Sequence, residues 1–105
     1  MTQFELVRVQ RYESIRDELA AMKPLLQAEF HVSEIGLFGS WVRGEQTEDS
    51  DLDVLVAFDE PISLLEFVRL ENVLSSRIGV DVDLVTKNSL KPRIKARVTE
   101  DVVYV

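Results

Sequence analysis

The chain has 105 residues, of which 46% are hydrophobic and 30% are charged, a composition that excludes a disordered, collagen-like or disulfide-stabilised protein. Its net charge of −7 disfavours a nucleic-acid backbone or an anionic membrane surface as the partner. The absence of cysteine excludes thiolate metal sites and fits a reducing, cytoplasmic location. No apolar run resembles a leader or a membrane span. We therefore expect residues 1–105 to form one small domain.

The first predicted element is a helix. Apolar residues recur every three or four positions, as one face of a helix requires: Tyr12, Ile15, Leu19, Met22, Leu26 and Phe30. Pro24 lies within this pattern, and its ring clashes with the carbonyl of Ala20, so we expect a kink or a restarted helix there. This divides the domain into an N-terminal helical segment, residues 1–23, and a core, residues 25–105.

Two strands are expected next. Residues 34–38 are apolar and end at Gly39, which indicates a short buried strand followed by a brief helical turn. Residues 51–58 alternate between apolar and polar positions. Asp51 and Asp53 therefore lie on one face of this second strand, and its apolar side chains lie on the other.

The remaining elements follow the same alternation. Pro61 predicts the start of a helix that ends at Gly79. Its apolar stripe consists of Leu64, Phe67, Leu70, Leu74 and Ile78. Residues 80–85 predict a third strand, Pro92 a short helix and residues 102–105 a last strand. The order α-β-α-β-α-β-α-β indicates an α/β (α+β) fold, a sheet with helices packed on one face.

The turn at Gly39 and Ser40 has two interpretations. Glycine allows a ligand to approach the backbone closely, and free N–H groups at a helix start attract phosphate. Alternatively, Gly39 only supplies the geometry of the turn and Ser40 caps the helix. On its own, this pair of residues favours the structural interpretation.

The carboxylates of two strands form the second candidate feature. Asp51 and Asp53 point to the same side of their strand, and Asp81 and Asp83 repeat this arrangement on the third strand. Carboxylates so close together repel one another unless a proton or a cation separates them, and Mg²⁺ prefers such oxygen ligands. An acidic chain gains nothing from concentrating this charge, which favours a bound metal over solvated side chains.

Together these two features resemble the polymerase-β-type nucleotidyltransferase superfamily. The string Phe38-Gly39-Ser40-x-x-Arg43-Gly44-(x)₅-Ser50-Asp51-x-Asp53 is similar to its smallest branch, the MNT-type minimal nucleotidyltransferases, as is the stretch Val82-Asp83-Leu84-Val85-Thr86. The resemblance covers the chain from about Leu25 to its end. It implies a small mixed sheet and transfer of a nucleoside monophosphate from an NTP to a hydroxyl group.

The resemblance also implies the roles of individual residues. Asp51 and Asp53 would hold Mg²⁺ or Mn²⁺, while Asp83 would help to hold one ion and accept the proton of the hydroxyl. Gly39 and Ser40 would bind the phosphates of ATP. Arg43 could reach phosphate, but we favour a structural bridge to Asp51, Asp49 or Glu45.

Two functions of different classes follow. In the first, the chain is an enzyme, an antitoxin that transfers AMP to a HEPN-domain ribonuclease toxin. Its small size supports a protein acceptor, because a domain of 105 residues has an open active-site face and needs a partner protein to form the opposite side of the cleft. In the second, the chain is a non-catalytic module that masks its partner by direct contact. The complete set Asp51, Asp53 and Asp83 favours catalysis.

Overall fold

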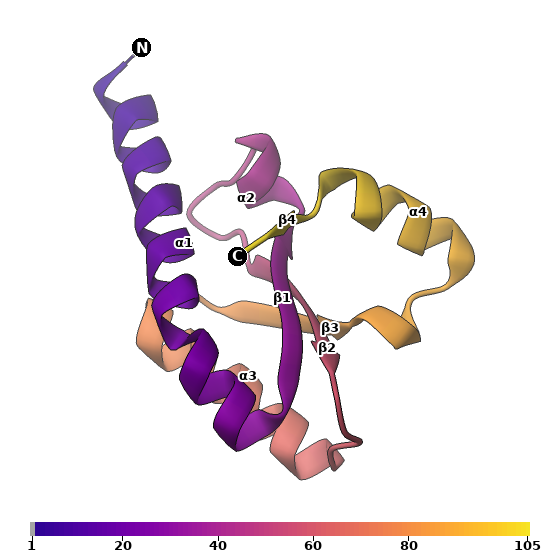
Figure 1. Ribbon diagram of the computed structural model, residues 1–105. Helices are drawn as coiled ribbons and strands as arrows, with labels where there is room; N and C mark the ends of the chain where they lie inside the picture. The colour runs from indigo at the N-terminus through magenta and orange to yellow at the C-terminus, as the bar shows by residue number, and fades with distance from the viewer. Residues whose placement is uncertain (1) are drawn as a thin grey trace.

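A computed structural model describes residues 2–105, the side chain of Phe4 excepted, so that Met1 of the predicted N-terminal segment lies outside the described residues. Figure 1 shows the elements in their predicted order. They are α1 (Gln3–Phe30), β1 (Val32–Phe38), α2 (Ser40–Arg43), β2 (Leu52–Phe58), α3 (Leu64–Ile78), β3 (Val82–Thr86), the 3₁₀ turn η1 (Lys87–Ser89), α4 (Pro92–Asp101) and β4 (Val103–Tyr104).

The four strands form one mixed sheet, as predicted, in the order β3-β2-β1-β4. β2 and β3 are parallel, whereas β1 runs antiparallel to both β2 and β4. α1 packs against β1, α3 packs against β3, and the two helices contact each other, so both cover the same face of the sheet. The other face carries Asp53 and Asp83, which the register places side by side on β2 and β3.

The core confirms the helical period of the N-terminal residues. Five of the six predicted positions are buried and belong to the central cluster, and Tyr12 packs against it partly exposed. α1 continues through Pro24, so the predicted restart is wrong: the apolar stripe on both sides of the proline packs into the same core and holds the two halves in one helix. Figure 1 shows the axis of α1 bending along its length, as expected of a helix that contains a proline.

Helix α3 begins three residues later than predicted. It starts at Leu64, after Ser63, whose hydroxyl accepts a hydrogen bond from the backbone N–H of Glu66 at 3.1 Å. This hydrogen bond satisfies one of the N–H groups that have no partner in the first turn of a helix, so the cap decides where α3 starts. Leu64, predicted on the apolar stripe, is 79% exposed, whereas Leu70 and Leu74 are fully buried.

Strand boundaries shift by one or two residues. β3 begins at Val82, so Asp81 precedes the strand, although its carbonyl accepts a hydrogen bond from the N–H of Leu52 at 2.8 Å. Within the described chain, none of the helices combines the length and the apolar character that crossing a bilayer requires.

Candidate active site

Gly39 brings the end of β1 against the carboxylate of Asp53. Its backbone lies at φ 81° and ψ −154°, a region that is open almost only to glycine. A Cβ atom at this position would overlap Oδ2 of Asp53 and lie 3.0 Å from its Cγ. The glycine is therefore required twice, for the conformation of the turn and for the room that the carboxylate occupies.

The three predicted carboxylates lie close enough for the charges of Asp83 and Asp51 to act on Asp53. Asp53 and Asp83 are register partners on the parallel strands β2 and β3, and Asp51 precedes β2 by one residue. Asp53 is half-buried, whereas Asp51 and Asp83 are exposed. The pKa of Asp53 is raised to about 6, mainly by burial and further by the charges of Asp83 and Asp51, while the charge of Arg43 opposes the shift. The charged form of Asp53 is therefore disfavoured in the folded protein.

The donor set fits a hard divalent cation. A cation such as Mg²⁺ neutralises carboxylates that repel one another, as Asp53 and Asp83 do across β2 and β3. Because Gly39 has no side chain, the Asp53 carboxylate lies directly against the backbone at the end of β1. Within residues 2–105, however, no three Asp, Glu, His or Cys side chains are already arranged as a metal cage. An ion at this site would keep positions for water and for phosphate oxygens, as Mg²⁺ in nucleotide enzymes does.

Ser40 is the first residue of α2, and Gly39 is its N-cap, so the alternative in which Ser40 caps the helix is wrong. Among the described residues, the Ser40 hydroxyl has no hydrogen-bond partner, and it is half-buried next to the glycine that contacts Asp53. A hydroxyl in this position is available to a ligand bound at the carboxylates.

Arg43 ends α2 and makes two ion pairs. Its Nε atom lies 3.1 Å from Glu45, one of the three partners we expected, and its Nη1 atom lies 3.0 Å from Asp101 of α4. Asp49 and Asp51 are not its partners within the described residues. Both hydrogen-bonded carboxylates raise the pKa of Arg43, Glu45 more strongly. The guanidinium therefore joins α2 to α4, a contact across 58 positions of sequence that no local pattern indicates.

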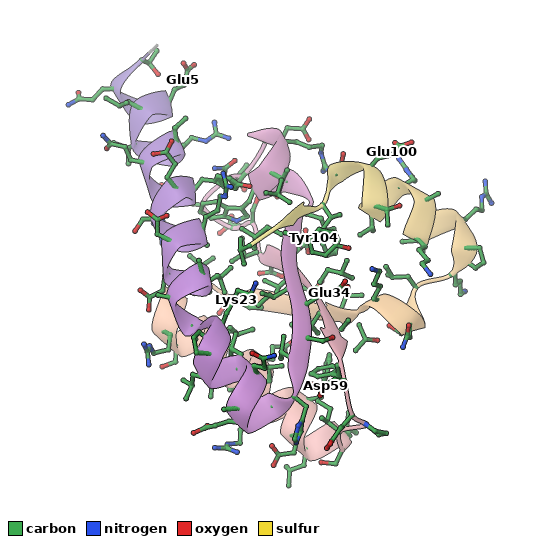
Figure 2. All side chains as sticks on the ribbon, viewed as in Figure 1. Glu5, Lys23, Glu34, Asp59, Glu100 and Tyr104 are labelled. Carbon is green, nitrogen blue, oxygen red and sulfur yellow. The ribbon has the colours of Figure 1, made fainter. Side chains whose placement is uncertain are left out.

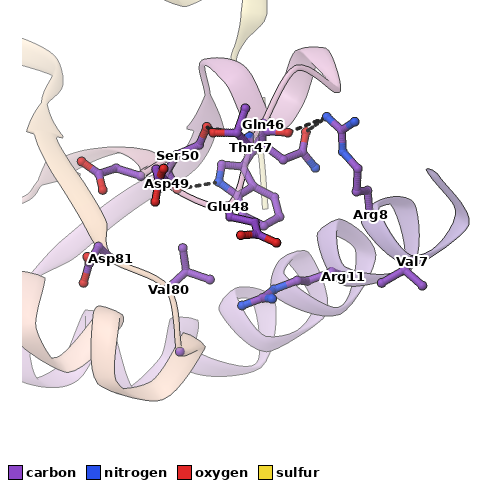
Figure 3. A pocket seen from close by; sticks show the side chains of 13 residues that line it. Val7, Arg8, Arg11, Gln46, Thr47, Glu48, Asp49, Ser50, Val80 and Asp81 are labelled. Carbon is purple, nitrogen blue, oxygen red and sulfur yellow. Dashed lines mark hydrogen bonds between the residues drawn. The ribbon is translucent and has the colours of Figure 1, made fainter. Parts of the chain in front are cut away.

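A cavity of about 500 Å³ lies beside the carboxylates, between α1 and residues 44–51, the segment joining α2 to β2 that we term the motif loop. Figure 3 shows Arg8 and Arg11 of α1 on one side of it and the motif loop on the other. Asp51 and Asp81 line it, but Asp53 and Asp83 do not. No pattern in the sequence indicates Arg8 or this cavity, because the contacts of Arg8 and the cavity depend on how α1 packs.

Basic side chains are concentrated in one stretch that we term the cationic segment, residues 87–97. It contains Lys87, Lys91, Arg93, Lys95 and Arg97, and all nineteen acidic residues of the chain lie outside it. Lys87 pairs with Glu34 at 3.1 Å. The other four make no ion pair with any residue that the structure describes, and all four are exposed. Positive charge is therefore locally concentrated before α4 and in its first part, ahead of Glu100 and Asp101 at the end of the helix.

The chain as a whole is similar to known proteins. Residues 13–105 match the family described as the nucleotidyltransferase domain. The chain belongs to this family. The predicted resemblance is thereby confirmed, and so is the class of enzyme, a nucleotidyltransferase.

Individual relatives give a finer comparison within the nucleotidyltransferases. The chain is 53% identical to protein adenylyltransferase MntA of Thermococcus cleftensis over 93 residues, which cover 89% of this chain and 94% of that one. A solved structure assigned as a minimal nucleotidyltransferase has a TM-score of 0.75 at 39% identity, covering 88% of this chain and 93% of the other. A solved toxin-antitoxin with AMP-PNP has a TM-score of 0.69 at 28% identity, covering 83% and 70%.

Proposed function

We propose that the chain is a metal-dependent protein adenylyltransferase that moves AMP from ATP to a hydroxyl group of a HEPN-domain toxin and so acts as its antitoxin. The observation that carries this proposal is the meeting of the Gly39-Ser40 turn with Asp53, which itself lies beside Asp83. The name of the Thermococcus relative and the ATP analogue in the toxin-antitoxin neighbour support the donor and the kind of acceptor. Use of ATP also agrees with a cytoplasmic location, which is part of the proposal.

Asp51 and Asp53 are proposed to hold Mg²⁺ or Mn²⁺, with Asp83 as a further ligand. When bound, such ions neutralise the charge of the phosphates and of the attacking and leaving oxygens. The Ser40 hydroxyl and the free backbone N–H groups at the start of α2 are proposed to hold the β- and γ-phosphates.

Asp83 is proposed to accept the proton of the acceptor hydroxyl. The hydroxyl oxygen then forms a bond to the α-phosphorus of ATP, the bond from that phosphorus to the bridging oxygen breaks, and pyrophosphate leaves. The register supports Asp83 over Asp81, since Asp83 lies opposite Asp53 within β3 and raises the pKa of Asp53, whereas Asp81 precedes the strand and lines the neighbouring cavity. Arg43 is proposed to hold α2 in place, because Glu45 and Asp101 occupy its guanidinium.

The test is the intact mass of the HEPN-domain partner after incubation with the chain, ATP and Mg²⁺. We expect the mass to rise by one or more AMP groups, and not to rise in EDTA. Asp83→Asn should abolish the increase, and Asp81→Asn, the matched control, should leave it near the wild-type rate. A partner that is neutralised without any mass change would show that the chain acts by masking.

A further inference from the structure

The first turns of α1 extend beyond the sheet and bury little apolar surface. Figure 2 shows Glu5 at the free end of α1, away from the strands. Leu6, Val7 and Val9 are exposed, and the buried stripe of the helix begins only at Ile15. The family match begins at residue 13, so these turns also lie outside the part of the chain that defines a nucleotidyltransferase. Hydrophobic burial does not explain why they are held against the body of the protein.

Arg8 supplies a polar connection from these turns to the motif loop. Its Nη2 atom donates to the carbonyl of Gly44 at 2.8 Å and to the carbonyl of Gln46 at 2.7 Å, and the side-chain Oε1 of Gln46 lies at 3.4 Å (Figure 3). Because Nη2 carries two hydrogens, each backbone carbonyl can receive one. Gln46 is 7% exposed and is the only buried polar residue among the side chains that the structure describes. One guanidinium thus fixes the first half of the loop.

The second half of the loop is held by other contacts. The indole Nε1 of Trp41 donates to the carbonyl of Ser50 at 3.5 Å, and the Ser50 hydroxyl accepts from the N–H of Thr47 at 2.8 Å. Arg11, one turn after Arg8 on α1, lies over the Trp41 ring at 6.0 Å. The loop has no helix or strand of its own and few backbone hydrogen bonds, among them those of Glu45 with Ser40 and of Ser50 with Thr47, so these side-chain contacts help to set the path that leads from α2 to Asp51.

We propose that Arg8 is a positioning residue of the active site: it holds the motif loop and, through the loop, fixes where Asp51 enters β2. In this role Arg8 acts through the loop and not on the substrate. A guanidinium suits this role because it presents several donors in a fixed plane and stays charged, whereas a lysine ammonium is a compact point charge on a flexible stem. The catalytic part of this inference depends on the proposed function, but the structural part does not.

Hydrogen exchange of the whole chain tests the structural part without any reaction. In Arg8→Ala we expect the hydrogen-bonded amides of Glu45, Thr47 and Ser50 to exchange at least about tenfold faster, because this loop has few other contacts, with smaller acceleration in Arg8→Lys. Arg16→Ala is the matched control, since Arg16 is an exposed arginine of the same helix that lies over Tyr12 at 5.8 Å. It should leave the loop unchanged. Equal protection of the loop in wild type and Arg8→Ala would overturn the proposal.

Kinetics test the catalytic part. We expect kcat of Arg8→Ala to fall at least about tenfold, with KM for ATP within about twofold and a Tm within about 2 °C of the wild type, because misplacement of a reacting group lowers the rate more than binding. Arg8→Lys should recover part of kcat. Faster exchange with an unchanged kcat would show that Arg8 is only structural. A wild-type chain that transfers no AMP would contradict the proposed function, while exchange would still decide whether Arg8 holds the loop.

Discussion

On the face of the sheet that α1 and α3 cover, Val54 of β2 is fully buried, whereas its neighbour Asp53 on the opposite face is half-buried beside a second carboxylate. One face gains stability from burial, and the other accumulates negative charge that the fold alone does not compensate. Val54 therefore stabilises the fold, whereas the adjacent Asp53 destabilises it. The acidic face therefore costs stability that the covered face supplies, and substitutions on the two faces should have opposite effects on stability and activity.

The largest effect is expected from Asp53→Asn. Losing a ligand of the proposed metal site should lower AMP transfer by about a thousandfold or more, since a metal ion contributes several kcal/mol to the transition state. The Tm in EDTA should stay the same or rise, because a repulsive charge is removed. Transfer assays and thermal melting of the same preparation check both statements, and wild-type activity that survives EDTA would contradict the role of the metal.

On the covered face, Leu19→Ala should have the opposite signature. Leu19 is fully buried in the cluster that α1 forms with the sheet, so truncation should lower the free energy of unfolding by about 2–5 kcal/mol. Activity per folded molecule should remain near that of the wild type, which urea unfolding and active-site titration can show together. A large loss of activity in the folded fraction would mean that the two faces are not separable.

Gly39→Ala should affect both faces at once. The conformation of Gly39 costs about 1–3 kcal/mol for a residue with a side chain, and the added Cβ must displace the Asp53 carboxylate. We expect a lower Tm together with a loss of transfer. Gly79→Ala is the matched control: Gly79 also has a positive φ, 82°, but an added Cβ there meets nothing within 4 Å, so it should lower the Tm and spare activity.

The smallest effect is a pH dependence in EDTA. The pKa of Asp53 is raised to about 6, so its protonated form stabilises the folded state fully below the ordinary value of 3.8, and this contribution is lost as the pH rises through 6. Between about pH 4 and about pH 7 the wild type should therefore lose about 1 kcal/mol relative to Asp53→Asn, a value reduced for solvent screening. Urea unfolding at both pH values measures the difference, and parallel curves would contradict it.

Patterns that repeat along the chain were predictable, and contacts between distant residues were not. The buried stripe from Ile15 to Phe30 follows from the helical period, and the partial exposure of Asp53 on the side opposite the buried Val54 follows from the strand period. The placement of Asp83 beside Asp53 followed from the family resemblance. The sequence missed the contact of Arg8 with Gly44, because no period relates residues 36 positions apart.

Two predictions that rested on proline needed correction for a physical reason of another kind. Pro61 was taken as the start of a helix, but the Ser63 cap decides the start of α3. At Pro24 a kink or a restarted helix was expected, and packing of the stripe carries α1 across the proline without a restart. A proline indicates only that a continuous helix is locally disfavoured at that residue. A side-chain hydrogen bond or a buried stripe, once formed, outweighs that preference.

The cationic segment gives an otherwise acidic molecule one local concentration of positive charge. Its five basic residues lie on and before α4, the other basic residues are spread along the rest of the chain, and Glu100 and Asp101 follow at the end of α4. In the field of a charged surface an uneven distribution of this kind produces a torque before any contact forms, so collisions become biased in orientation. Added salt shortens the range of this field to about 10 Å at 0.1 M and weakens the alignment. Collisions of the cationic segment with a negatively charged surface are thereby favoured, although the net charge of the chain is negative.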